Sequence, residues 1–414
     1  MIIFVYTIIF AAFLDECFGV RGGCCTPNTN DDFDIDDFKY QGDPIRFSCI
    51  TAHSQSDFYM TDVNGSIPAA LVERLNNGNG LSLFFHGAAN VVHTSSELLS
   101  SFANEWFKAS GNNICIVTYA YTTRSSRGLK MYAIVNEMVK TRRLEYVAKM
   151  AGDLVAIQCL NVSQVDVSGF SFGAHVAGRT SQYLLRKTGE RVRILLALDP
   201  IKPPLFGAKI RDSIKRGYAN YVQVIHTSRK LGIWDQMGDV DVYVKYEVVK
   251  NLGPLNDEHG LAFFIHLATA TKRLFIAANL KGDGNGNVMK SDDLIFEDEC
   301  VVGVYGGLKS VHRGKKLVLL LGKRDPVFWD QIGMFRDAEI FLGSQEVEKE
   351  EKISDPNGEE CVLCFENKKN VLLKPCKHKE ICNSCWNKWK IEQFTSTPKC
   401  PICRREVTKS EVKK

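Results

Sequence analysis

Short apolar segments alternate with longer amphipathic segments between about residues 40 and 340. Each short segment is rich in branched or aromatic side chains and is bounded by turn-forming residues, which is typical of buried strands. The longest predicted helix runs from Lys130 to Leu160. Strands that alternate with helices indicate an α/β fold. The predicted strands are Leu81–Phe85, Ile114–Ala120, Gln164–Val167, Ile194–Leu198 and Tyr221–His226.

The pattern changes after Phe341, where charged and turn-forming residues replace the apolar segments. Residues 343–360 are rich in Glu, Lys and Ser and predict a solvated linker. We therefore expect an α/β domain over 20–342 and a second, small domain over 361–405. Seven of the 14 cysteines lie between Cys361 and Cys403, which gives the second domain a chemistry of its own.

The N-terminus carries an apolar run from Ile2 to Leu14, which is short for a membrane span and typical of the core of a signal peptide. We expect residues 1–19 to be a signal peptide, with a buried N-terminal strand as the alternative. The acceptor sequons at Asn64 and Asn161 are compatible with secretion. The net charge of +4 among 414 residues is too small to indicate a nucleic-acid partner.

The strongest candidate for chemistry is Ser171, in the segment Gly169-Phe-Ser171-Phe-Gly173. Alternating valines precede this segment and small helix-forming residues follow it, so the serine is expected on a sharp strand-to-helix turn. Such a turn exposes the hydroxyl, and the amides of the following helix face the position where an oxyanion would form. This pattern predicts a nucleophilic serine.

A nucleophilic serine needs a base, and that base needs an orienting carboxylate. Asp199 ends the next predicted strand and is the expected carboxylate. Three histidines follow it. His226 ends a strand, His259 lies in a polar loop before a helix, and His266 lies further along the same helix. A loop position favours His259, and the residues alone leave His226 open.

With these motifs in place, the chain resembles the pancreatic lipase family, and most of all its short invertebrate lipase and phospholipase A1-like branch. The segment Gly169 to Gly178 is similar to that family's serine motif, with Phe170 and Phe172 at positions that usually hold His and Leu. Leu198-Asp199-Pro200, Tyr221–Thr227, Gly238–Tyr243 and Phe84–Gly87 continue the resemblance.

The resemblance implies an α/β-hydrolase fold with Ser171, Asp199 and His259 as the catalytic triad. It also implies an oxyanion hole made by the amides of Ala88 and Phe172. The cysteine that precedes the family's histidine is missing, and the segment between Tyr243 and His259 is too short for a long lid. In the family, short lids accompany phospholipase activity. We therefore expect a lipid esterase that acts on phospholipid or acylglycerol at a membrane or micelle surface.

The cysteine-rich domain holds eight soft metal ligands at regular pairwise spacing. They are Cys361, Cys364, Cys376, His378, Cys382, Cys385, Cys400 and Cys403. Two tetrahedral zinc sites would use all eight, and a disulfide framework would have no use for the histidine.

The ligand order resembles a RING finger, in which alternate ligand pairs share one ion. That resemblance assigns Cys361, Cys364, Cys382 and Cys385 to one zinc and the other four ligands to the second. RING fingers recruit ubiquitin-conjugating enzymes, which makes such an enzyme an expected partner. Val362, Trp389 and Pro401 lie where that contact is usually made, and Arg404 resembles the residue that clamps loaded ubiquitin.

The two domains favour different compartments. A signal peptide predicts the secretory pathway, whereas ubiquitin transfer needs the cytoplasm. Two functions therefore stay open: a secreted or vesicular lipid esterase with a zinc module, or a cytosolic ubiquitin ligase whose lipase-like domain binds lipid or substrate. Cys115 and Cys159 lie in apolar stretches and are expected to be free, while Cys24, Cys25, Cys49 and Cys300 could form disulfides in a pairing that the sequence does not define.

Overall fold

The computed structural model describes most of the region from residue 44 to residue 321 and much of the cysteine-rich domain. The expected signal peptide over 1–19, the linker over 343–360 and Cys159 lie outside the described residues. The described residues are 44–54, 57–87, 97–119, 135, 138–139, 141–158, 160–202, 212–229, 231–246, 256–280, 287–321, 328, 361, 368–392, 397–400 and 405–412.

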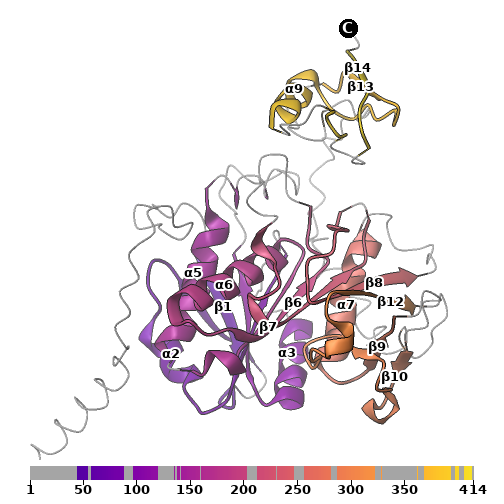
Figure 1. Ribbon diagram of the computed structural model, residues 1–414. Helices are drawn as coiled ribbons and strands as arrows, with labels where there is room; N and C mark the ends of the chain where they lie inside the picture. The colour runs from indigo at the N-terminus through magenta and orange to yellow at the C-terminus, as the bar shows by residue number, and fades with distance from the viewer. Residues whose placement is uncertain are drawn as a thin grey trace, which may run out of the picture.

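A nine-stranded sheet forms the centre of the large domain (Figure 1). Its strand order is β12-β8-β7-β6-β5-β3-β4-β1-β2, and all neighbours pair in parallel except around β1, which is antiparallel to β2 and β4. All five predicted strands are present, with ends that shift by a few residues. The strands are β1 Ile45–Ile50, β2 Tyr59–Val63, β3 Leu81–Phe85, β4 Asn113–Thr118, β5 Asp166–Phe170, β6 Val192–Leu198, β7 Ala219–His226, β8 Val240–Tyr246 and β12 Lys315–Leu321.

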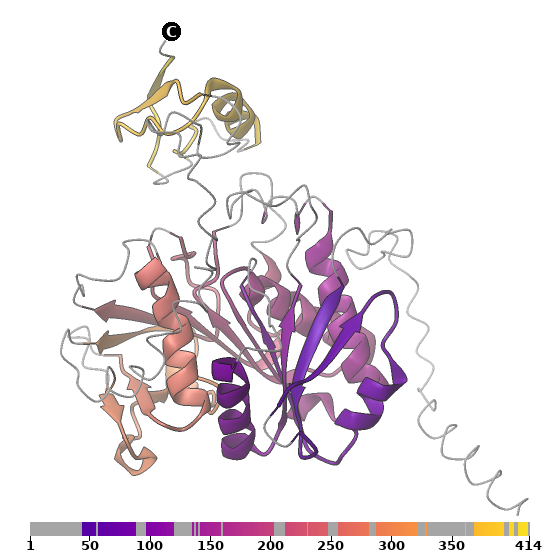
Figure 2. The ribbon, with the colours of Figure 1, turned by 180° about the vertical axis from the view of Figure 1, so that it is seen from behind.

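Helices cover both faces of this sheet (Figures 1 and 2). α2 (Ala69–Leu75), α5 (Arg143–Ile157) and α6 (Phe172–Thr188) cover one face, and α3 (Glu97–Ser110) and α7 (Asn256–Ala270) cover the other. Strand β3 serves both layers, because successive side chains point to opposite faces. Leu83 and Phe85 join one core and Phe84 joins the other. This architecture explains why the strands read as continuous apolar runs.

The predicted helix from Lys130 does not run unbroken to Leu160. Arg142 has φ 55°, a left-handed conformation that interrupts a helix, and α5 begins only at Arg143. None of the helices in the described part of the chain has the length and apolar character needed to span a bilayer. The remaining short elements are β9 Phe275–Ala278, β10 Asn287–Met289, β11 Cys300–Val301, η1 Val162–Gln164, η3 Asp292–Leu294 and η4 Ser310–His312.

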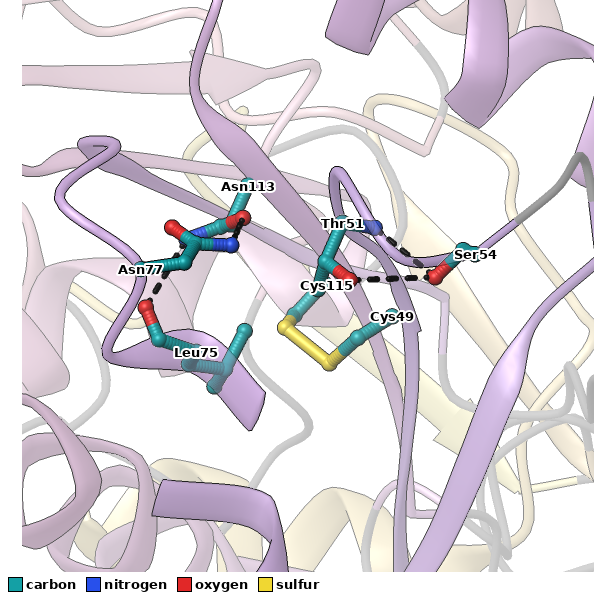
Figure 3. Close-up of a disulfide and its surroundings, with 7 residues drawn as sticks. All are labelled: Cys49, Thr51, Ser54, Leu75, Asn77, Asn113 and Cys115. Atoms are coloured by element: carbon teal, nitrogen blue, oxygen red, sulfur yellow. Dashed lines mark hydrogen bonds between the residues drawn. A yellow bond between two sulfur atoms is a disulfide. The ribbon is translucent and has the colours of Figure 1, made fainter. Parts of the chain in front are cut away.

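A disulfide joins Cys49 of β1 to Cys115 of β4 (Figure 3). The two residues lie directly opposite each other in the antiparallel pair, with Cα atoms 4.1 Å apart. The expectation that Cys115 is free was therefore wrong, because the pairing of β1 with β4 brings a partner to it. Cys300, which the sequence allowed as a disulfide partner, is buried and free.

The cysteine-rich domain has a small core of its own. Strands β13 (Val371–Lys374) and β14 (Lys409–Val412) form an antiparallel pair, and α9 (Asn383–Glu392) follows β13 in the chain. Trp386 of α9 packs in the core with Val371 and Leu373 and is 1 % exposed. Trp386 therefore belongs to the core of this domain.

Candidate active site and metal centre

Ser171 lies between β5 and α6 in a strained conformation, with φ 60° and ψ −119°. A non-glycine residue rarely adopts such a positive φ, and residues that do so cluster at functional sites. The two glycines of the motif, Gly169 and Gly173, lie where there is no room for a side chain. A Cβ on Gly169 would collide with the backbone of Gly173, and a Cβ on Gly173 would collide with the carbonyl oxygens of Phe85 and His86. The turn therefore packs against the end of β3, where the family resemblance expects one oxyanion donor.

Asp199 follows β6 directly and is fully buried. Its Oδ1 accepts hydrogen bonds from the backbone amides of Thr227 and Ser228, at 2.9 and 3.1 Å. These two donors come from the end of the neighbouring strand β7, and they help satisfy a charge that would be costly to bury alone. Its Oδ2 remains available for a third partner.

His259 completes the group from the first turn of α7, so it lies inside the helix and not in the loop before it that the sequence predicted. Its Nδ1 lies 2.6 Å from Asp199 Oδ2, and its Nε2 lies 2.8 Å from Ser171 Oγ. Because the carboxylate can only accept, Nδ1 donates to it, which leaves Nε2 free to accept the serine proton. The ring of Phe170 packs against this imidazole, with centroids 4.8 Å apart.

The two other histidines that follow Asp199 contact different groups. His226 Nε2 lies 2.9 Å from Asp241 Oδ1, which belongs to the neighbouring strand β8. His266 stacks on Phe84 in an aromatic cluster, where burial lowers its pKa to about 3. His259 is thus the histidine that the fold brings to Ser171 and Asp199.

The predicted oxyanion donors are described only in part. Phe172 is the first residue of α6, so its amide belongs to the helix N-terminus. Ala88 lies outside the described residues. The end of β3 just before it is held by a contact that the sequence did not reveal, because Tyr119 donates from its hydroxyl to the His86 carbonyl at 2.6 Å.

The metal-ligand residues gather into two groups in the cysteine-rich domain. Cys361, Cys382 and Cys385 form one group, and Cys376, His378 and Cys400 form the other. Within each group the ligand atoms lie within 4.8 Å of one another. Thiolates and imidazole are ligands that suit zinc. Cys364 and Cys403, like Val362, Pro401 and Arg404, lie outside the described residues.

A parallel sheet with a strained serine after one strand, an aspartate after the next and a histidine beyond it defines an α/β-hydrolase. The family comparisons agree with this class. Residues 71–246 match the lipase family model, and residues 357–410 match the model for C3HC4-type RING zinc fingers. The chain is therefore similar to lipases in its large domain and to RING-type zinc fingers in its cysteine-rich domain. The match to the lipase family model ends at residue 246 and does not include His259. The structure shows that this histidine lies beside Ser171 and Asp199.

Curated relatives match each domain separately. "Phospholipase A1 VesT1.02" of Vespa tropica is 27% identical over 50% of this chain and 68% of its own length. "Phospholipase A1 4" of Polistes dominula is 34% identical over 25% of this chain. "E3 ubiquitin-protein ligase NEURL3" of Mus musculus is 49% identical over 12% of this chain and 18% of its own length. The chain spans 32% of the length of the Polistes protein.

Among solved structures, an esterase of Pyrobaculum calidifontis aligns at 17% identity, with a TM-score of 0.24, over 55% of this chain and 73% of its own. The strand order and the match to the lipase family model define the fold of the large domain.

Proposed function

We propose that the large domain is a serine esterase that hydrolyses carboxylic esters of lipids. The hydrogen-bonded series Ser171–His259–Asp199 carries this proposal. In the first step Ser171 Oγ bonds to the ester carbonyl carbon while His259 Nε2 takes the hydroxyl proton. The carbon–oxygen bond to the alcohol then breaks, and His259 gives the proton to the departing oxygen. Water repeats the sequence on the acyl-enzyme, which releases the fatty acid and restores Ser171.

Asp199 holds the imidazole in the tautomer that accepts at Nε2 and stabilises the imidazolium that forms during the reaction. The amides of Phe172 and Ala88 would donate to the negative oxygen of the tetrahedral intermediate. Losing one such donor typically costs about 10²- to 10³-fold in kcat.

We favour phospholipid over triacylglycerol as the substrate. Two features support this choice: the curated relatives named above that match the large domain are phospholipases A1, and only a short segment separates Tyr243 from His259. Release of fatty acid from phosphatidylcholine vesicles and from triacylglycerol emulsions would measure the preference. Faster hydrolysis of the emulsion would reverse the assignment.

Ser171→Ala tests the reaction itself and should abolish ester hydrolysis. Ser168→Ala is the matched control, because Ser168 lies in β5, the strand that leads to Ser171, and its buried hydroxyl donates to the Leu83 carbonyl instead of to His259. His259→Ala should behave like Ser171→Ala, whereas equal rates in Ser171→Ala and the parent would refute the proposal.

For the zinc finger we propose two ions, with the ligand pairs alternating between them. The separation of Cys361, Cys382 and Cys385 from Cys376, His378 and Cys400 supports this count, and Cys364 and Cys403 would complete the two sets. Bound zinc would supply much of the folding free energy of so small a domain. Metal analysis of the purified chain should give two zinc ions per molecule, and one ion would contradict the proposal.

A second candidate function is ubiquitin transfer through the RING finger, favoured by the 49% identity to a mouse ubiquitin ligase over 51 residues. The partner would be a ubiquitin-conjugating enzyme. Purified chain, ubiquitin, activating enzyme and a panel of conjugating enzymes should yield ubiquitin chains that Cys385→Ser abolishes. If no conjugating enzyme yields chains, the finger is a scaffold rather than a ligase.

We propose the secretory pathway as the compartment of the esterase. The Cys49–Cys115 disulfide and the exposure of both sequon residues, Asn64 and Asn161, support this choice. Expression in animal cells should give a glycosidase-sensitive protein, and Asn64→Gln with Asn161→Gln should remove that sensitivity. An uncleaved, unglycosylated product in the cytoplasm would favour the ubiquitin-ligase alternative.

A further inference from the structure

A second histidine–aspartate pair lies behind the proposed active site. His226, the last residue of β7, and Asp241, near the start of β8, are both fully buried. His226 Nε2 lies 2.9 Å from Asp241 Oδ1, and His226 Nδ1 lies 2.8 Å from the Ile233 carbonyl oxygen. The Ile233 carbonyl can only accept, so Nδ1 donates to it, and the hydrogen bond between Nε2 and Oδ1 joins the ring to the Asp241 carboxyl group. The pair is a buried, hydrogen-bonded histidine and aspartate.

The Asp241 carboxyl group also accepts hydrogen bonds from the end of the loop that joins β7 to β8. Met237 donates its amide to Asp241 Oδ1 at 2.9 Å, and Gly238 donates its amide to Oδ2 at 3.0 Å. Together with the His226 contact to Ile233, the pair holds this loop at its start, its middle and its end. The ring of Tyr243 stacks on His226, with centroids 4.5 Å apart, and closes the cluster on one face.

The same loop surrounds Asp199. Thr227 and Ser228 donate to Asp199 Oδ1, and a Cβ on Gly232 would collide with the carboxylate, so the loop backbone lies directly against it. Ile233 also donates its amide to the Pro200 carbonyl at 2.7 Å, next to Asp199 in the chain. Among the described residues, every hydrogen bond of the Asp199 carboxylate other than that of His259 therefore comes from the loop that the buried pair holds.

We propose that His226 and Asp241 are positioning residues for the esterase reaction: they fix the loop that orients Asp199, and through it His259. This inference rests on the proposed function. Removing one partner of a buried hydrogen-bonded pair leaves polar groups of the other partner and of the loop unsatisfied, which favours a displacement of the loop. A displacement of about 1 Å at a reacting group can cost about 10²-fold in rate.

The test compares Asp241→Asn with Asp239→Asn. Asp239 is also buried and lies two residues away, but its carboxylate accepts from the Val222 amide in the middle of β7 and not from the His226 ring. Both variants should lose stability, so rates are measured well below both unfolding transitions. We expect Asp241→Asn to lower kcat about a hundredfold with little change in KM, and Asp239→Asn to leave both parameters near the parent values.

A double-variant comparison separates positioning from general damage. If the pair acts through Asp199, adding Asp241→Asn to Asp199→Asn should lower kcat further by less than about threefold, because coupled effects are not additive. A full hundredfold further loss would overturn the proposal. Equal losses in Asp241→Asn and Asp239→Asn would overturn it as well.

A nuclear magnetic resonance measurement, which does not depend on ester hydrolysis, tests this inference separately from the proposed function. The proton between His259 Nδ1 and Asp199 should give a downfield imidazole resonance in histidine-labelled protein, absent from Asp199→Asn. Asp241→Asn should shift or broaden it and Asp239→Asn should not. If the parent shows no Ser171-dependent hydrolysis, the esterase proposal fails and this resonance decides the structural claim. An unchanged resonance in Asp241→Asn refutes that claim.

Discussion

Removing the Cys49–Cys115 disulfide should lower the free energy of unfolding by about 5 kcal/mol, most of it loop entropy. The bond closes a loop with a sequence separation of 66 residues. In the chain-entropy model a loop of that length restricts the unfolded chain by about 4 kcal/mol at 25 °C. Both residues are fully buried in the core between the sheet and α2, so the lost sulfur atoms add a cavity cost of about 1 kcal/mol.

The measurement is equilibrium unfolding in guanidinium chloride, followed by circular dichroism, of Cys49→Ala/Cys115→Ala. Cys300→Ala is the matched control, because Cys300 is equally buried but free. We expect the double variant to lose several times more stability than the control. A loss no larger than that of the control would refute the loop-entropy reasoning, and peptide mapping without reductant that finds no linked Cys49 and Cys115 would refute the bond itself.

Three further predictions concern separate parts of the chain. Burial lowers the pKa of His266 to about 3 from an ordinary 6.5, so between pH 6.5 and 3 only the unfolded state takes up this proton, and the free energy of unfolding falls by about 1.4 kcal/mol per pH unit. His266→Phe lacks this proton uptake, so between pH 7 and pH 4.5 its free energy of unfolding should fall by about 2 to 3 kcal/mol less than that of the parent. Identical losses would contradict a buried neutral ring. Gly173→Ala should abolish labelling of Ser171 by a fluorophosphonate, because the new Cβ would collide with the end of β3. Gly307→Ala has open space around the new Cβ and should label normally. Normal labelling of Gly173→Ala would contradict this packing. Chelation of zinc should expose Trp386, seen as a red shift in fluorescence, while ester hydrolysis persists; loss of both together would show that the two domains depend on each other.

The sequence offered the candidates that depend on local pattern. Ser171 lies in a Gly-x-Ser-x-Gly motif between a predicted strand and helix, and Asp199 ends the next predicted strand, so motif and order were enough to select both as candidates. His259 needed the family resemblance, because its contact with Ser171 spans 88 residues and is set by the docking of α7.

The features that the sequence did not reveal all depend on which strands become neighbours. The Cys49–Cys115 bond requires the register of β1 against β4. The amides of Thr227 and Ser228 carry no side-chain signal, and they reach Asp199 because β7 lies next to β6. His226 reads as a buried strand residue, and its pairing with Asp241 follows from the pairing of β7 with β8.

The place of Phe328 determines where the two domains can be separated in the laboratory. Phe328 is fully buried in the same core cluster as Leu317, Leu319 and Leu321 of β12. A fragment that ends with the lipase-family match at residue 246 would omit α7 and His259, and one that ends at Leu321 would leave a cavity where this ring packs. A cut that yields an intact hydrolase and an intact zinc finger must fall after Phe328 and before Cys361.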